Sequence, residues 1–108
     1  MKIEDNLRIV SLIDTYGVLL TTRQFDIVTS YYFDNLSLSE IGDNYSISRQ
    51  AVSDCINQSI KALETYEEKL KVISKEKSIV DKLSVIVREC DNKQLSEKIC
   101  KVIEDIRR

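Results

Sequence analysis

The sequence contains no proline, no histidine and no tryptophan, and glycine occurs only twice among its 108 residues. With so few helix-breaking residues, long helices are favoured over a turn-rich β architecture. The absence of histidine removes a common metal ligand and the usual general base of enzymes. Three cysteines, none in a Cys-x-x-Cys spacing, cannot build a four-ligand zinc site. We therefore expect a helical protein that holds no metal and no cofactor.

Patterns that would indicate an enzyme or a membrane protein are also missing. The chain has no glycine-rich phosphate loop and no HExxH or GxSxG motif, so we expect no catalytic activity. The amino terminus MKIEDNLRIV has no uninterrupted apolar run, which predicts neither a secretory signal nor a membrane span. A cytoplasmic protein with reduced thiols is expected. Cys55, Cys90 and Cys100 are then expected to fill the core as small apolar side chains.

Charge is distributed unevenly along the chain, which carries a net charge of −2. Residues 1–60 contain four cationic side chains and eight carboxylates, whereas residues 61–108 contain twelve cationic side chains and ten carboxylates. A protein that binds nucleic-acid phosphates over a long footprint is expected to be strongly basic. Neither part is strongly basic, which counts against tight non-specific DNA binding but leaves room for a local basic stripe.

The segment SLSEIGDNYSISRQAVSDCI, residues 37–56, predicts a helix-turn-helix motif. Ser37 and Glu40 have the spacing of a capping box, in which each side chain accepts a hydrogen bond from the backbone amide of the other residue. The first motif helix is therefore expected to begin here. Ser48 can cap a second helix that starts at Arg49.

Two small residues of this segment are expected to shape the motif. Gly42 is predicted where the two helices come closest, because a larger side chain would hold them apart. Ser46 stands in the turn, where glycine is common, and a positive φ at a residue other than glycine costs about 1 kcal/mol. The inward side of the second helix is expected to consist of Val52, Cys55 and Ile56.

Two helices are predicted before the motif, because apolar residues recur there at three- and four-residue spacing. The first should cover about residues 3–16, with Leu7 among its apolar positions, and end at Gly17 in the left-handed conformation. The second should begin after Thr21 or Thr22 and reach about Phe33. Its predicted apolar positions include Phe25, Val28, Tyr31 and Tyr32.

The run Tyr31-Tyr32-Phe33 could be read as a platform on which nucleic-acid bases stack. Adjacent residues of a helix point about 100° apart, so these three rings cannot form one flat stack. We expect them to pack in the core, with one hydroxyl exposed.

The second motif helix is expected to extend well beyond the motif. Its apolar stripe spans three heptads with one polar residue, at Val52, Ile56, Ser59, Leu63, Tyr66, Leu70 and Ile73. No glycine or proline interrupts it before Ser74, which could cap the next helix. Further helices are expected over about residues 75–89 and 93–106, separated by a turn at Asp91-Asn92. These boundaries predict a helix-turn-helix domain over residues 1–73 and a helical hairpin or extension over residues 74–108.

The stripe leaves two arrangements open. Residues 52–63 are expected to pack within the chain, whereas residues 66–73 could pack within the chain or form the seam of a homodimer. The two carboxy-terminal helices could fold together as an αα-hairpin or dock on a partner. The charged run Glu67-Glu68-Lys69 is expected to be a solvated face.

The outward side of the second motif helix is the candidate binding face, because this helix enters the major groove in DNA-binding helix-turn-helix proteins. Its candidate contact residues are Arg49, Gln50, Ser53, Asn57 and Lys61. Arginine can pair with guanine, and glutamine or asparagine with adenine. Asp54 lies among them and has the wrong sign for phosphate. Sequence-specific DNA binding, RNA binding and use of the motif as a protein-docking scaffold all remain open.

Two segments carry a resemblance to a known family: TYGVLLTTRQFDIVTSYYFDNLSLSEIGDNYSISRQAVSDCI and the following KALETYEEKL. Together they resemble the YlxM family, small bacterial proteins whose genes commonly neighbour those of signal recognition particle components. The patterns YG-LLT--Q, YY-DNLSL-EI and SRQAV-D-I occur in this order, and the resemblance covers about residues 1–72. The remaining third is similar only in length and helical character.

The resemblance implies an all-α fold, a helical bundle with a helix-turn-helix like that of region 4 of bacterial sigma factors. It also implies a regulatory or accessory role in the signal recognition particle pathway, with the protein or the RNA of that particle as the partner. A sequence-specific transcription regulator that binds DNA through the same face is the alternative.

Overall fold

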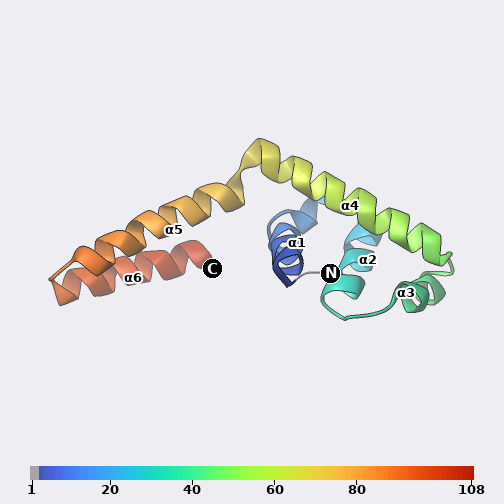
Figure 1. The fold of residues 1–108 in the computed structure, drawn as a ribbon, viewed down its shortest axis with the longest axis horizontal. Helices are drawn as coiled ribbons and strands as arrows, with labels where there is room; N and C mark the ends of the chain where they lie inside the picture. Colours follow the sequence, from blue (N-terminus) through green and yellow to red (C-terminus); the bar gives the residue numbers. More distant parts are fainter. Residues whose placement is uncertain (1–2) are drawn as a thin grey trace. The chain divides into compact units, whose positions relative to one another are not determined.

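The computed structural model describes residues 3–108, and over this range the chain forms six α-helices, one short 3₁₀ helix and no strand (Figure 1). The elements are α1 (Ile3–Tyr16), the 3₁₀ helix η1 (Gly17–Leu19), α2 (Thr22–Tyr32), α3 (Leu38–Tyr45), α4 (Arg49–Leu70), α5 (Val72–Glu89) and α6 (Lys93–Arg107). The predicted all-α fold is confirmed, including the helix-turn-helix, the long second motif helix and the carboxy-terminal helical extension.

The chain divides into two compact units, with the division after Leu70. At this point α4 ends, and Lys71 adopts the left-handed conformation with φ 54° before α5 begins. The predicted continuation of the helix to Ile73 and the cap at Ser74 are therefore wrong. Apolar spacing alone does not reveal this break, because a single left-handed lysine changes no hydrophobic position and costs only about 1–2 kcal/mol.

The first unit is organised around α4, against which α1, α2 and α3 all pack (Figure 1). Its core consists of apolar side chains from all four helices, namely Ile9, Leu12, Ile13, Tyr16, Ile27, Val28, Ile41, Val52, Ile56 and Leu63. Full burial of one such aliphatic side chain contributes about 1.5–3 kcal/mol. The inward positions predicted at Val52 and Ile56 are confirmed, as is the packing of residues 52–63 within the chain.

Ser59, the polar interruption of the apolar stripe, lies completely buried within this core. Its Oγ donates a hydrogen bond of 2.7 Å to the carbonyl oxygen of Cys55, one turn earlier in α4. A buried hydroxyl is costly only when it has no partner, and here the helix itself supplies one. Ser59 can therefore lie on the buried face of α4 without leaving its hydroxyl group unsatisfied.

Gly17 does not end α1 in the left-handed conformation, because neither glycine has a positive φ. It begins η1 instead, and a Cβ atom at this position would lie 2.9 Å from the ring carbon Cε2 of Phe25. Glycine thus makes room for an aromatic ring. Leu7, expected on the inward face of α1, is 64% exposed, whereas Ile9 is buried.

The aromatic run in α2 forms no flat stacking surface. The rings of Tyr31 and Tyr32 are nearly perpendicular, at 83° with centroids 5.0 Å apart. Burial raises the pKa of the Tyr32 hydroxyl, and the neighbouring Tyr31 raises it further. The expected core packing is wrong for Phe33, which is exposed at the end of α2.

The cysteines differ in their surroundings. Cys55 and Cys90 are half-buried and Cys100 is exposed, so the expectation that all three fill the core is wrong for Cys100. All three are free thiols.

The second unit is a hairpin of α5 and α6, which pack against each other (Figure 1). The predicted turn at Asp91-Asn92 is confirmed, and Asn92 caps α6 by accepting a hydrogen bond of 3.1 Å from the amide of Leu95. In this unit only Val80 is fully buried. Between Ile3 and Arg108, no helix is both long enough and apolar enough to cross a membrane.

Gly42 generates the first testable prediction, because a Cβ atom there would lie 2.7 Å from the carbonyl oxygen of Ile47. The amide of Ile47 in turn donates to the carbonyl oxygen of Gly42 at 2.9 Å, so this backbone has little freedom to move away. Although alanine usually stabilises a helix relative to glycine, we expect Gly42→Ala to lower the free energy of unfolding by about 1–3 kcal/mol. Urea denaturation measures this change.

The matched control is Asn44→Ala, at an exposed position of the same helix. That variant should change the free energy of unfolding by less than about 0.5 kcal/mol. A Gly42→Ala variant as stable as the parent chain would show that the turn can move away from α3.

Candidate binding face of the helix-turn-helix

Side-chain caps position both helices of the motif. The Ser37 hydroxyl accepts from the amide of Glu40 at 3.1 Å, and the Glu40 carboxylate accepts from the amide of Ser37 at 3.2 Å. Ser48 accepts from the amide of Ala51 at 3.0 Å. The predicted capping box and the predicted cap of the second helix are confirmed, and each satisfies backbone amides that a helix start leaves without a partner.

The turn between α3 and α4 reverses the chain through Ser46, which has φ 56° and ψ 42°. This is the left-handed conformation, so serine here adopts the backbone geometry that glycine commonly supplies at this position. Ile47 follows half-buried, and Ile41 of α3 is completely buried. The turn is held by backbone hydrogen bonds, from the amide of Ser46 to the carbonyl oxygen of Asp43 and from the amide of Ile47 to that of Gly42.

The amino-terminal half of α4 presents the candidate residues to solvent as the spacing predicted. Exposed side chains on this face are Arg49, Gln50, Asp54, Asn57 and Lys61. Ser53 differs because it is half-buried, and it lines a shallow hollow together with Leu38, Arg49 and Gln50. The start of α3 and the start of α4 thus form one continuous surface. That these residues bind a partner stays a prediction.

Two of the face residues bind each other. The Gln50 side-chain amide donates to the Asp54 carboxylate, with 3.0 Å between Nε2 and Oδ1. Recognition of adenine by glutamine requires this same amide as a donor. Asp54 therefore opposes nucleic-acid binding in two ways, by its negative charge and by engaging the donor of Gln50.

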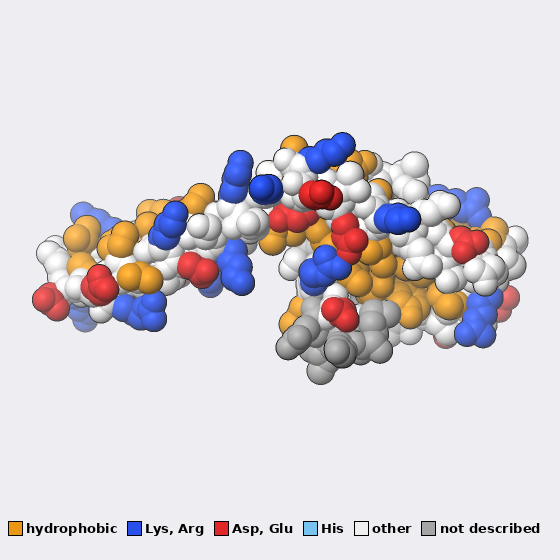
Figure 2. All heavy atoms as spheres, turned by 45° about the horizontal axis from the view of Figure 1, so that its top comes forward, with side chains coloured by type: hydrophobic (Ala, Val, Ile, Leu, Met, Phe, Trp, Pro, Cys, Tyr) orange, Lys and Arg blue, Asp and Glu red, His pale blue; other side chains and the backbone are white. Residues whose placement is uncertain are grey.

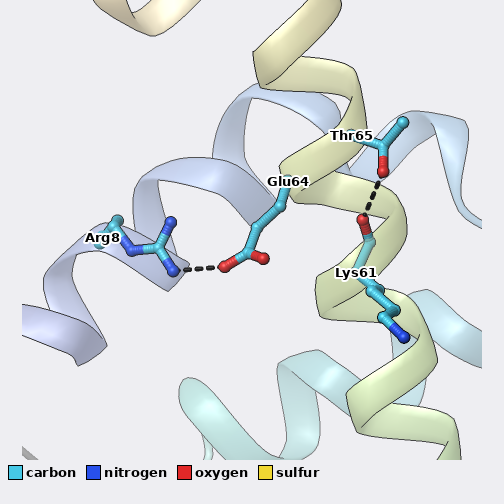
Figure 3. Close-up of polar contacts among 4 residues, drawn as sticks. All are labelled: Arg8, Lys61, Glu64 and Thr65. Carbon is cyan, nitrogen blue, oxygen red and sulfur yellow. Dashed lines mark hydrogen bonds and ion pairs between the residues drawn. The ribbon is translucent and has the colours of Figure 1, made fainter.

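The cations of the face have no carboxylate partner among the described side chains, those of residues 5–108. The ion pair found among these side chains joins Arg8 of α1 to Glu64 of α4. Figure 3 shows the Lys61 side chain pointing away from this pair. On the side of the first unit seen in Figure 2, basic and acidic side chains are interspersed, and neither sign forms a continuous patch. Arg49 and Lys61 are consequently available to an anionic partner, on a surface of mixed charge.

Glu67 was expected on a solvated face, and this expectation is wrong. Its carboxylate accepts a hydrogen bond of 2.6 Å from the hydroxyl of Tyr16, whose ring is buried and tilted against that of Tyr66. The two partners are 51 residues apart, and no sequence motif connects them. This contact joins the end of α1 to the last part of α4.

Sequence reasoning also missed an apolar hollow in the first unit. Its lining residues are Ile13, Asp14, Gly17, Val18, Leu20, Thr22, Phe25 and Phe33. Three of these apolar residues, Val18, Phe25 and Phe33, are among the exposed large hydrophobic side chains. No three potential metal-ligating side chains gather at one point within residues 5–108, whose side chains the structure describes.

The sequence of nearly the whole described region matches a known family. Residues 3–105 match the UPF0122 family, described as "Putative helix-turn-helix protein, YlxM / p13 like". The chain belongs to this family. The match extends to residue 105, in the last turn of α6, whereas the resemblance seen in the sequence motifs ended near residue 72. The carboxy-terminal hairpin is therefore part of the family pattern.

Individual family members are similar over most of their length. A UPF0122 protein of Clostridium perfringens is 41% identical over 103 residues, covering 94% of this chain and 92% of its own. One of Clostridium acetobutylicum is 37% identical over 110 residues, covering 93% of this chain and 95% of its own. One of Pediococcus pentosaceus is 46% identical over 74 residues, which cover 68% of this chain and 66% of its own.

Ser46 provides a test of the turn geometry. Because a left-handed serine costs about 1 kcal/mol that glycine does not, we expect Ser46→Gly to raise the free energy of unfolding by about 0.5–1 kcal/mol. Thermal denaturation followed by circular dichroism measures this difference. Ser39→Gly, at an exposed position of α3, should lower it by a similar amount. Equal losses in both variants would contradict the left-handed turn.

Proposed function

We propose that this protein is a non-enzymatic regulatory or accessory binding protein of the signal recognition particle pathway, acting in the cytoplasm. It contacts the protein or the RNA of the particle through the exposed face of α4. The contact residues are Arg49, Gln50, Ser53, Asn57 and Lys61. The pathway rests on the resemblance to the YlxM family, and the contact face rests on the geometry of the motif.

The observation that carries this proposal is the mixed charge of the exposed motif. Phosphate contacts supply much of the affinity of DNA complexes and require cations. Here two cations, Arg49 and Lys61, share the face with Asp54, which also engages the Gln50 amide. Such a surface suits a partner that offers both donors and anionic groups, as a protein or a folded RNA does, better than a uniform row of phosphates.

The test is association with the purified protein and the purified RNA of the particle, each measured separately. We expect binding to at least one of them, and the double variant Arg49→Ala/Lys61→Ala should weaken it at least tenfold because both cations are lost. Isothermal titration calorimetry measures the dissociation constant. Arg23→Ala, an exposed cation on α2, is the matched control and should bind like the parent chain. No association with either component would refute the proposal.

Sequence-specific DNA binding is the second candidate function, favoured by the exposed amino-terminal half of α4. In this reading Arg49 and Gln50 reach base edges in the major groove, with Asn57 about two turns further along the helix. Both proposed functions use the same face. Substitutions on that face must therefore distinguish them by whether the binding affinity rises or falls and by how the affinity depends on salt concentration.

Asp54→Asn tests the DNA-binding function. For DNA binding, the substitution removes a repulsive charge and leaves Gln50 with a weaker, uncharged acceptor, so affinity for a duplex should rise at least several-fold. Arg49→Ala and Gln50→Ala should each reduce that affinity, and binding should fall steeply with salt. Fluorescence anisotropy with genomic duplex fragments at low salt measures these changes. Asp43→Asn, an exposed carboxylate on α3, is the control. A chain that binds no fragment at low salt does not act on DNA in this way.

A further inference from the structure

The α5–α6 hairpin leaves one of its sides apolar and exposed. The seam between the two helices is formed by α5 positions Val80, Leu83 and Val87 and by α6 positions Ile99, Ile103 and Ile106, which are buried or half-buried. Next to this seam lies a second line of apolar residues on each helix. Ile79 and Ile86 lie on α5 with exposed fractions of 49% and 50%, and Leu95 and Val102 lie on α6 with 49% each.

These two lines fall on the same side of the hairpin. Each member of the α5 line immediately precedes a seam residue, as Ile79 precedes Val80. On α6, Val102 precedes Ile103, and Leu95 precedes the half-buried Ser96, seven residues before Ile103. In an antiparallel pair of helices, the positions that precede the seam lie on one common side. The four residues therefore form one surface, here called the hairpin face: Ile79, Ile86, Leu95 and Val102. Hydrophobic side chains do reach the surface between charged ones along this unit (Figure 2).

The opposite side of the hairpin is polar. Five of the six positions that follow the seam by one residue are polar or charged, namely Asp81, Ser84, Arg88, Glu104 and Arg107, and the sixth is Cys100. Exposed apolar surface is thus not distributed at random over the two helices. A seam with one flanking apolar line is the pattern of a helix that has two helical neighbours, as in a four-helix bundle. In the hairpin each helix has only one.

We propose that the hairpin face binds the hairpin face of a second copy of this chain, so that two hairpins form a four-helix bundle. Within each line the residues are seven apart, so a twofold axis can set the line of one copy along the line of its partner. The second hairpin gives every helix its missing neighbour. A single helix from another protein would cover only part of the face.

The exposed area is compatible with a dimer. Four half-exposed aliphatic side chains leave roughly 350 Å² of apolar surface on each copy, the size of patch that marks an interaction site. If about 65% of the interface is apolar, as in homodimers, two copies bury roughly 1,100 Å² in total. This lies near the lower limit of specific interfaces, so the dimer should dissociate on dilution.

The mass of the full chain in solution tests this proposal. Sedimentation equilibrium should show a concentration-dependent rise from 12.5 kDa towards twice that mass. The double variant Ile79→Lys/Ile86→Lys should raise the dissociation constant at least tenfold, because it places cations in an apolar interface. The matched control is Val85→Lys, next to Ile86 and also an exposed apolar residue, but pointing away from the hairpin face. It should dimerise like the parent chain.

A second measurement on the unmodified chain does not depend on the folding of any variant. Hydrogen exchange at rising protein concentration should increasingly protect the amides of α5 and α6, while those of α2 and α3 remain unchanged. Three results would overturn the proposal: a monomer at every concentration, a dimer that the double variant leaves intact while Val85→Lys disrupts it, or hairpin protection that is independent of concentration. The last result would mean that another part of the same chain covers the face.

Discussion

The buried face of α4 is the constraint on which the first unit depends. Val52, Ile56, Ser59 and Leu63 form one inward line, and α1, α2 and α3 are all held against this helix. A helix of this kind is stable because of the tertiary contacts on its apolar face rather than through its own propensity. The buried serine belongs to the same face, since its hydroxyl is satisfied within α4. The orientation of every other helix in this unit follows from packing on that line.

The same constraint determines which residues of the motif meet solvent. Once the inward line is buried, helical geometry places Arg49, Asn57 and Lys61 outside. The turn at Ser46 and the close approach of Gly42 to Ile47 then fix α3 beside the start of α4. The exposed side is less suited to nucleic-acid binding than the motif alone would indicate, because Asp54 and Gln50 bind each other. A helix-turn-helix is an arrangement of the backbone, and the side chains on its outer face determine which partner it can bind.

The two units bury their apolar residues to different extents. The first unit encloses a core drawn from four helices, whereas the hairpin fully buries only Val80. Small two-helix assemblies seldom gain enough apolar burial to be stable without further packing. The hairpin is nevertheless part of the family pattern, since the family match extends to residue 105. An exposed apolar side on such a unit is consistent with a surface that is covered in the functional state.

Local interactions were predictable from the sequence, and long-range contacts were not. The caps at Ser37 and Ser48 and the exposed side of α4 depend on residues within one or two helical turns, so spacing alone identified them. Tertiary structure alone decided the role of Gly17, which makes room for Phe25, and the bond from Tyr16 to Glu67. It also decided the pairing of Arg8 with Glu64, 56 residues apart. Such contacts arise only when packing brings distant segments together, and no local spacing records them.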